Sequence, residues 1–199
     1  PVQASHQVKV LQILNYYFVL CTLYMKVYTK KGDDGKTFTG ASERELKSSK
    51  SAELTGSIDE LHVQLGIACS LFREHYQEEE MYHLLQALTS KCLDIGSIVY
   101  FVNSNNTQST SKLLQESFSE STTKKMEKYI DAIEATLSEL KEFIIFDSCN
   151  NTGMALHNAR THTRRMERFF VDWYQSKEPN ENMYLVQRYI NRLSDLLFV

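Results

Sequence analysis

The segment HNARTHTRRMER, from His157 to Arg168, is the part of the sequence that most clearly sets the fold. Arginines recur in it at intervals of four residues: Arg160, Arg164 and Arg168. On an α-helix this spacing places their guanidinium groups along one edge. The apolar residues in and after the segment fall on another edge: Ala159, Met166, Phe169 and Trp173. The pattern predicts an amphipathic helix over about residues 152–175, whose cationic edge is either screened by water or faces an anion.

The composition is that of a helix-rich globular protein. The chain has 199 residues, 42% of them hydrophobic, with only two prolines and seven glycines. A domain of this length buries about 70% of the surface of its unfolded chain, which is enough for a single core. The formal net charge is −3. Because binding to a nucleic-acid backbone needs clustered basic residues, nucleic acid is not an expected partner.

The cysteines are too far apart for a local disulfide or metal pattern. There are four of them: Cys21, Cys69, Cys92 and Cys149. No C-x-x-C pair and no Cys/His ligand spacing occurs. We interpret them as reduced thiols of an intracellular protein.

Residues 1–24 differ from the rest of the chain. Lys9 is their single charged residue, and no Asp or Glu occurs before Asp33. The apolar stretch around Tyr16 is too short and too interrupted to span a membrane, which needs about 20 apolar residues. An acid-free leader suits an organellar presequence, but such peptides are usually rich in arginine and this one has none. We expect a leader or a non-native extension at 1–24 and one domain at 25–199.

A short glycine-containing turn follows an extended piece at residues 25–30. It reads KGDDGKT, from Lys31 to Thr37. Two glycines three residues apart permit a backbone whose N–H groups converge, and the lysines add positive charge. The segment is therefore either a phosphate cradle or an ordinary charged turn, and the local pattern leaves both open.

Five helices are expected, forming an all-α, up-and-down bundle with the extended N-terminal loop across one end. The first begins at Ser57, which forms a capping box with Glu60. The others cover about residues 79–101, 122–141, 152–175 and 182–198. The Ser/Thr/Asn-rich stretch from 103 to 121 is expected to be a loop.

Polar residues on these helices predict an anion site at one end of the bundle. Arg192 and Asp195 are spaced for a pair, and Asp59 is a candidate partner for Arg160, since a buried guanidinium needs a carboxylate. No nucleophile–base pair or metal site is indicated, and we interpret His157 as a structural histidine. A polyphosphate is the natural anion for such a site.

Five motifs in this order resemble one known family. They are YTKKGDDGKT (28–37), GSIDEL (56–61), FII (143–145), HNART with RRMER (157–168) and NRLSD (191–195). Over residues 25–199 the chain resembles the propanediol-utilisation-type ATP:cob(I)alamin adenosyltransferases. The resemblance implies a five-helix bundle forming a homotrimer with active sites between subunits. It also implies transfer of the 5′-deoxyadenosyl group of ATP to the cobalt of reduced cobalamin, which gives adenosylcobalamin and triphosphate.

The same resemblance assigns the site residues. The loop is expected to hold the triphosphate and Mg²⁺ through Thr29, Lys30, Lys31, Gly32, Asp33, Gly35, Lys36 and Thr37. Further nucleotide contacts are expected from Lys47, Arg164, Arg165, Glu167, Arg168 and Asn191. Arg160 paired with Asp59 is expected to shape the catalytic site, and Phe143 to occupy the lower face of the corrin. Mg²⁺ is expected to be held mainly through the ATP phosphates.

The resemblance also implies partners and a place in the cell. A reductase must supply cob(I)alamin, and an adenosylcobalamin-dependent enzyme must accept the product. The acid-free leader and the site of action of animal relatives favour mitochondria, with the cytoplasm as the alternative.

Several positions depart from the family pattern, mainly on the cobalamin side. Phe-Asp-Ser at residues 146–148 replaces Pro-Gly-Gly, and the chain ends at Val199, where the last helix normally continues. Other departures are Lys31, Ser51 and His62. They leave as alternatives a non-catalytic, ATP-responsive cobalamin carrier of the same fold, or a purely structural bundle.

Overall fold

The computed structural model describes residues 28–139, 149–177 and 182–199. The chain divides into two units, residues 1–34 and residues 35–199. Phe143, the departure at residues 146–148 and the expected domain boundary at Met25 lie outside the described residues.

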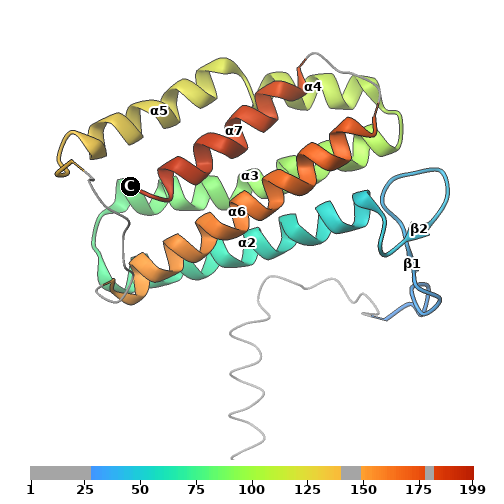
Figure 1. The fold of residues 1–199 in the computed structure, drawn as a ribbon, viewed down its shortest axis with the longest axis horizontal. Coiled ribbons are helices and arrows are strands. Elements are labelled where there is room, and N and C mark those ends of the chain that lie inside the picture. Colours follow the sequence, from blue (N-terminus) through green and yellow to red (C-terminus); the bar gives the residue numbers. More distant parts are fainter. Residues whose placement is uncertain (1–27, 140–148, 178–181) are drawn as a thin grey trace, which may run out of the picture. The chain divides into compact units, whose positions relative to one another are not determined.

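The second unit is a bundle of helices with one small hairpin (Figure 1). Strands β1 (Lys36–Thr37) and β2 (Glu45–Leu46) pair antiparallel, with Lys36 opposite Leu46. The helices are α2 (Lys50–His75), α3 (Glu79–Asn103), α4 (Thr107–Ser117), α5 (Glu120–Glu134), α6 (Asn151–Gln175) and α7 (Met183–Leu196). The expectation of an all-α bundle is confirmed.

The first long helix, α2, begins earlier than the sequence analysis predicted. The side chain of Ser49 accepts a hydrogen bond from the backbone N–H of Ala52 at 3.2 Å and so caps the helix. The predicted cap at Ser57 is wrong. Ser57 is buried within α2, and its hydroxyl donates to the carbonyl of Leu54 at 2.8 Å. The earlier start adds the fully buried Leu54 to the apolar edge of α2.

The stretch expected to be a loop contains helix α4, so that expectation is wrong. Asn106 caps the helix by accepting a hydrogen bond from Ser109 N–H at 3.0 Å. Thr110 and Leu114 are buried, and Phe118 follows with 1% exposure. Serine and glutamine residues on the outer side of α4 conceal this narrow apolar edge in the sequence. Helix α5, in contrast, ends at Glu134, before the predicted end at 141.

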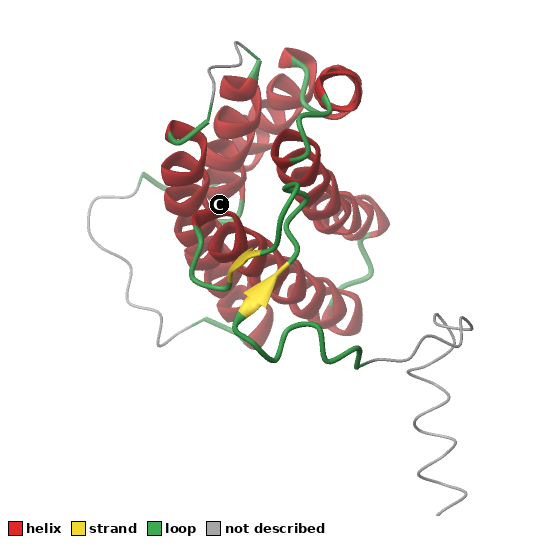
Figure 2. Ribbon diagram, turned by 90° about the vertical axis from the view of Figure 1, so that its right-hand side faces the viewer, coloured by secondary structure: helices red, strands yellow, loops and turns green. Residues whose placement is uncertain are grey.

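The helices pack in an order that differs from their order along the chain. Helix α2 contacts mainly α6 and α3, while α7 lies between α6 and α5. Helix α4 lies against α3 and α7. The β1–β2 hairpin lies at the end of the bundle where α2 begins (Figures 1 and 2). One apolar core runs through all of these helices, with Trp173, Tyr189 and Phe170 among its largest buried side chains.

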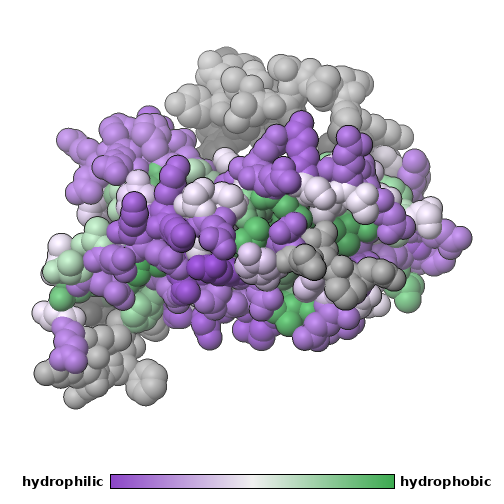
Figure 3. Space-filling view, turned by 90° about the horizontal axis from the view of Figure 1, so that it is seen from above, coloured by the Kyte–Doolittle hydropathy of each residue, from purple (hydrophilic) through white to green (hydrophobic). Residues whose placement is uncertain are grey.

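The outer faces of the helices are mostly polar. In the view of Figure 3, hydrophilic side chains dominate and apolar ones show only in separate small areas. None of the described helices is long and apolar enough to cross a membrane. Cys69, Cys92 and Cys149 are free thiols, as expected, and Cys21 lies outside the described residues.

Candidate functional site

Helix α6 carries the predicted cationic edge. It begins at a cap formed by Asn150, whose side chain accepts a hydrogen bond from Gly153 N–H at 2.8 Å. Arg164 and Arg168 are exposed one turn apart, and Arg168 Nη1 donates to the carbonyl of Arg164 at 3.0 Å. The opposite edge of α6 is buried in the core as Ala159, Met166, Phe170 and Trp173. The amphipathic helix is confirmed, except that Phe170 rather than Phe169 is the fully buried aromatic.

Arg160 lies at the side of α6 that faces the C-terminus of the chain. Its guanidinium carbon is 5.6 Å from the centre of the Phe198 ring, an arrangement in which a cation is attracted to the ring face. The Nε of Arg160 is buried and has no hydrogen-bond partner among the described residues. A buried guanidinium nitrogen without a partner is costly, so this group is suited to meet an acceptor from outside the described residues.

Asp59 does not pair with Arg160 within the chain. Its side chain is exposed on α2 and makes no hydrogen bond or ion pair with the described residues. It lines a hollow of about 580 Å³ between α2 and α3, together with Phe38, His62 and Tyr100. Arg160, in contrast, contacts Phe198 beyond α7. The two predicted partners therefore face different sides of one subunit.

Glu60, the neighbour of Asp59, connects α2 to α6. Its carboxylate lies 3.3 Å from Arg165 Nη1 and 3.5 Å from His162 Nδ1. The side chains of Glu60 and Arg165 are 45% and 49% exposed, so solvent screens the pair and its contribution to stability is small. Of the predicted nucleotide contacts on α6, Arg165 thus has a carboxylate partner within the chain.

The structure brings Glu167 and Asn191 together, although they come from different motifs. Asn191 Nδ2 donates to Glu167 Oε1 at 3.0 Å, joining α6 to α7. One residue further on, Arg192 pairs with Asp195 at 2.6 Å, as its spacing predicted, and with Glu127 of α5 at 3.1 Å. Asn191 thus connects α7 to α6, whereas Arg192 connects it to α5.

The predicted phosphate loop falls partly in each of the two units. Within the first unit, residues 31–34 form a turn, and Lys30 has a φ of 60°. Thr29, Lys31, Gly32 and Asp33 belong to the same described segment. Within the second unit, Gly35 has a φ of 76°, a conformation that favours glycine. Lys36 and Thr37 form β1.

Lys47 joins the predicted loop through its backbone. Its N–H donates to the carbonyl of Gly35 at 2.9 Å, so residues from separate sequence motifs become neighbours in the hairpin. The exposed side chain of Lys47 and the exposed Lys36 are therefore carried by the same small element. The hairpin also carries Arg44, Glu43 and Glu45, so the two exposed lysines, and not a large net charge, are what it offers to an anion.

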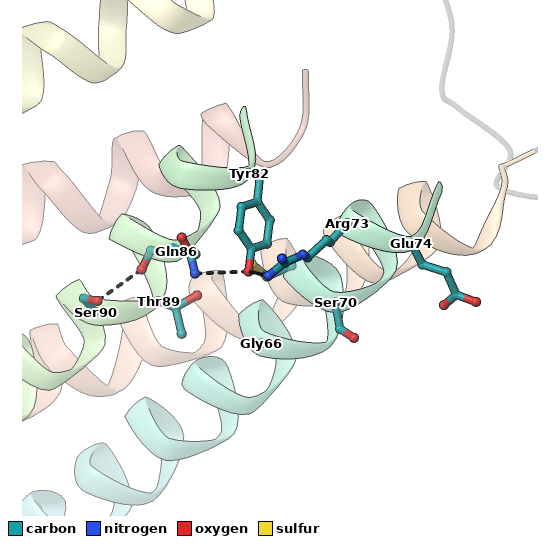
Figure 4. Close-up of a pocket in the computed structure, with 9 residues that line it drawn as sticks. Gly66, Ser70, Arg73, Glu74, Tyr82, Gln86, Thr89 and Ser90 are labelled. Carbon is teal, nitrogen blue, oxygen red and sulfur yellow. Dashed lines mark hydrogen bonds between the residues drawn. The ribbon is translucent and has the colours of Figure 1, made fainter. Parts of the chain in front are cut away.

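A second hollow, of about 670 Å³, contains none of the predicted site residues. It lies between the second half of α2 and the first half of α3 (Figure 4). Arg73 lies 4.9 Å from the centre of the Tyr82 ring and donates to its hydroxyl at 2.9 Å. Gln86 donates to the same hydroxyl at 3.1 Å. Arg73, Tyr82 and Gln86 thus form hydrogen bonds with one another. We therefore do not regard this hollow as a candidate site, and Arg73 can serve as a control for Arg160.

The outer face of α3 carries exposed apolar residues that were not predicted from the sequence. Leu93 and Tyr100 are 61% and 46% exposed there, and both line the hollow that contains Asp59. Phe38, from the hairpin, is 60% exposed beside them. Leu93 and Tyr100 are seven residues apart, so they lie on one face of α3 that is separate from its core face. This spacing was the signal in the sequence that could have identified them. Exposed apolar surface of this kind marks contact with a ligand or another protein.

His157 responds to the charge of Arg160, which lies three residues along α6. The pKa of the His157 imidazole is lowered, first by burial and second by the positive charge of Arg160. In the unfolded chain the imidazole has a pKa of about 6.5, so the unfolded state binds more protons as the pH falls below that value. The free energy of unfolding therefore decreases in this range.

Replacing His157 is expected to reduce the acid sensitivity of the fold. In the His157→Gln variant the melting temperature should fall less between about pH 7.5 and about pH 5.5 than in the unsubstituted protein, because no proton can bind at this position. Thermal unfolding followed by circular dichroism measures both. An equal fall in the two proteins would contradict the interpretation of His157 as a partly buried imidazole whose pKa is lowered in the folded protein.

The fold and the site define a helical-bundle protein with an arginine edge on α6 and a hairpin that carries two exposed lysines, Lys36 and Lys47, groups suited to a polyphosphate ligand. Residues 27–199 match the protein-family model described as cobalamin adenosyltransferase. The chain belongs to the cobalamin adenosyltransferase family. The resemblance identified from the five motifs is thereby confirmed.

Individual relatives agree with the family match. The chain is 36% identical to the corrinoid adenosyltransferase of Bacillus subtilis, covering 87% of this chain and 83% of that protein. It is 35% identical to the corrinoid adenosyltransferase MMAB of Mus musculus, covering 87% and 70%. Among solved structures, a variant of the PduO-type ATP:corrinoid adenosyltransferase from Lactobacillus reuteri, complexed with cobalamin and ATP, is similar with a TM-score of 0.71. The identity to it is 29%, and the similarity covers 87% of this chain and 90% of that one.

Proposed function

We propose that the protein transfers the 5′-deoxyadenosyl group of ATP to the cobalt of cob(I)alamin. The electron pair of Co(I) forms the bond to the ribose C5′, and the bond between C5′ and the triphosphate oxygen breaks. That bonding pair leaves with triphosphate, and adenosylcobalamin is the second product. Because the cobalt is the nucleophile, the protein needs no catalytic serine, cysteine or histidine. Its tasks are to align the two substrates and to stabilise charge on the departing triphosphate.

The observation that carries the proposal is the family match over residues 27–199, because it includes both the predicted phosphate loop and the arginine helix. The ligands of the related Lactobacillus reuteri structure, cobalamin and ATP, are the two substrates of this reaction. At 29% identity and a TM-score of 0.71, that likeness extends beyond the general fold.

The triphosphate is held by the loop and the hairpin in this proposal. The residues proposed to contact the triphosphate together with its Mg²⁺ are Thr29, Lys30, Lys31, Gly32, Asp33, Gly35, Lys36, Thr37 and Lys47. Arg164, Arg165 and Arg168 supply further positive charge from α6, where their guanidinium groups can bind phosphate oxygens with paired hydrogen bonds. The hydrogen bond from Asn191 to Glu167 supports this arrangement, because it fixes both side chains next to the arginine edge.

Mg²⁺ would be held mainly by the phosphate oxygens of ATP. The described residues contain no cluster of three or more His, Cys, Asp or Glu side chains placed to bind a metal ion. A magnesium ion usually keeps several waters and binds substrate phosphates, so a dedicated protein cage is not required. Bound in this way, Mg²⁺ neutralises part of the charge on the triphosphate.

The cobalamin end of the site is assigned to Arg160, Asp59 and Phe143. Arg160 and Asp59 shape the site, and Phe143 occupies the lower face of the corrin. The chain departs from the family pattern at residues 146–148, immediately after the FII segment at 143–145. We therefore expect the affinity for the corrinoid to differ more from that of the relatives than the affinity for ATP.

The active unit in this proposal is a homotrimer with sites between subunits. Asp59 faces the hollow between α2 and α3, whereas Arg160 faces Phe198, so one chain does not bring them into contact. Asp59 has no partner among the described residues, and Arg160 Nε is buried without one. The exposed Leu93 and Tyr100 supply apolar surface beside Asp59.

Sedimentation equilibrium tests the trimer and should give the mass of three chains. The Asp59→Arg variant should dissociate, because it places two arginines opposite each other. Adding Arg160→Asp should restore the trimer, because the two charges are then opposite again.

The proposal also requires partners before and after the reaction. A reductase must supply cob(I)alamin, and an adenosylcobalamin-dependent enzyme must accept the product.

Residues 1–24 would be a leader or extension outside the domain at 25–199. The acid-free composition of this segment and the mammalian relative favour a mitochondrial location, and the bacterial relative favours a cytoplasmic one. Import of the full chain into isolated mitochondria distinguishes these locations.

An anaerobic transfer assay tests the function. Purified protein is mixed with MgATP and chemically reduced cobalamin, and the absorbance band of Co(I) is followed. ATP-dependent decay to the spectrum of adenosylcobalamin is expected. No decay in a protein that binds ATP would instead favour the cobalamin carrier.

Thermal unfolding with and without MgATP tests the purely structural bundle. MgATP at about 100 times its dissociation constant should add about 2.7 kcal/mol to the free energy of unfolding of a protein that binds it. An unchanged melting temperature would therefore favour the structural bundle.

A further inference from the structure

The loop that connects β1 to β2 is tightly held on the last turn of α3. Thr39 is 7% exposed, and Gly40 is also buried. Gly40 has a φ of 96°, and a Cβ added there would lie 2.6 Å from the carbonyl oxygen of Tyr100. Only glycine therefore permits this approach. The ring of Phe38 meets that of Tyr100 edge to face, with 6.2 Å between centroids.

Asn103, the last residue of α3, joins this loop to two other helices. It is 8% exposed, and its Nδ2 donates to the carbonyl of Thr39 at 2.9 Å. Its Oδ1 accepts from Trp173 Nε1 of α6 at 3.2 Å and from Ser51 Oγ of α2 at 3.4 Å. An indole N–H can only donate and a backbone carbonyl can only accept, so these partners fix which end of the amide faces which way. One buried side chain thus connects the hairpin, α2 and α6.

This junction lies next to the proposed triphosphate ligands. Lys36 and Thr37 form the strand before the anchored loop, and Lys47 follows directly after β2. On the other side of the junction, Trp173 lies at the end of the arginine helix, and Lys50 pairs with Asp172 at 2.7 Å. Any shift of the loop at this junction would move Lys36 and Lys47 relative to α6.

We infer that Asn103 is a positioning residue for the nucleotide: its amide holds the β1–β2 hairpin on the end of α3 through the carbonyl of Thr39. This inference rests on the proposed function for the identity of the ligand. Asn103 itself lies beneath the hairpin and touches no reacting atom. Its effect should therefore fall on the binding of the triphosphate, and not on adenosyl transfer once both substrates are bound.

The Asn103→Asp variant separates the loop contact from the helix contacts. A carboxylate has nearly the same shape and still accepts from Trp173 and Ser51, but it has no N–H for the carbonyl of Thr39. Two oxygens then face each other, and the loop is released. The matched control is Asn106→Asp, because it adds the same charge three residues along and its oxygen still caps α4. Trp173→Phe removes the opposite side of the junction and leaves the contact to Thr39.

The expected result is a selective loss of ATP binding. Asn103→Asp should raise the KM for ATP by about tenfold, the usual order for one buried hydrogen bond, while kcat and the KM for cobalamin change by less than about twofold. Gly40→Ala should act in the same direction, because it displaces the same loop. Asn106→Asp and Trp173→Phe should keep the KM for ATP, although Trp173→Phe lowers the melting temperature.

Two measurements without turnover keep this inference separate from the proposed function. Calorimetric titration with MgATP in the absence of cobalamin should show the same tenfold loss of affinity in Asn103→Asp. Trypsin should cleave after the exposed Arg44, in the loop, about tenfold faster in this variant than in Asn106→Asp. Absence of adenosyl transfer in the unsubstituted protein would reject the proposed function only. Unchanged cleavage, or an equal loss of ATP affinity in Asn103→Asp and Trp173→Phe, would overturn the inference.

Discussion

Replacing Arg160 with alanine is expected to lower kcat/KM for adenosyl transfer by at least about 100-fold, the usual cost of removing one charged group that acts in the transition state. Arg160 is the arginine whose Nε is buried without a partner among the described residues, so its hydrogen-bonding capacity is available to a ligand or a neighbouring subunit. The anaerobic transfer assay, with both substrates varied, measures the effect. Arg160→Lys should recover only part of the activity, because an ammonium group cannot reproduce the planar guanidinium.

Arg73 provides the matched control for this prediction. It too lies over an aromatic ring, that of Tyr82 at 4.9 Å, but in the hollow that contains none of the proposed ligands (Figure 4). Arg73→Ala removes the same number of atoms and a similar ring contact, and it should leave kcat/KM unchanged. Near-normal turnover in Arg160→Ala, or an equal loss of kcat/KM in both variants, would contradict the role assigned to Arg160.

The largest effect on stability is expected for Phe170→Ala. Phe170 is 0% exposed and lies 5.8 Å from the centre of the Trp173 ring, inside the contact of α6 with the core. Removing its ring deletes buried apolar area and leaves a cavity that the surrounding helices cannot fill completely. The free energy of unfolding should fall by about 3–5 kcal/mol. Urea unfolding followed by circular dichroism gives this difference.

The neighbouring Phe169 offers the same substitution in a different environment. It is only partly buried and lies beneath Arg165, at 5.7 Å from the guanidinium carbon to the ring centre. Phe169→Ala should cost about 1 kcal/mol, the typical size for a point substitution. Equal losses at the two positions would contradict the placement of Phe170 in the core. They would also favour the apolar edge through Phe169 that the sequence pattern predicted.

The long helices could be predicted because their core positions repeat at helical spacing over several turns. Helix α6 is the clearest case, since Ala159, Met166 and Trp173 are seven residues apart and all are buried. Helix α4 could not be recognised in this way. Its buried edge includes Thr110 and Ser117, which a hydrophobicity pattern counts as polar. The start of α2 was misplaced because Ser49 and Ser57 are both plausible caps, and only tertiary packing decides between them.

The candidate site could be predicted only where its contacts lie within one helix. Contacts one turn apart on a helix, such as Arg192 with Asp195, follow from spacing alone. Glu167 and Asn191 are separated by 24 positions, and their contact depends on how α6 and α7 pack. The junction at Asn103 is still less local, since it links the hairpin to the ends of two long helices. Its asparagine and glycine lie in unrelated stretches, so no motif marks them.

The indole that donates to Asn103 belongs to the only tryptophan in the chain. Trp173 is fully buried at the end of the bundle where the hairpin is attached, so its fluorescence comes from a single, defined place. Excitation of this residue gives an emission spectrum that needs no added label and is not averaged over several sites. Loosening of the hairpin, binding of a nucleotide or unfolding of the bundle can each be followed as a change in that one signal. The protein thus contains its own optical probe at the part of the fold where the proposed nucleotide site meets the packed helices.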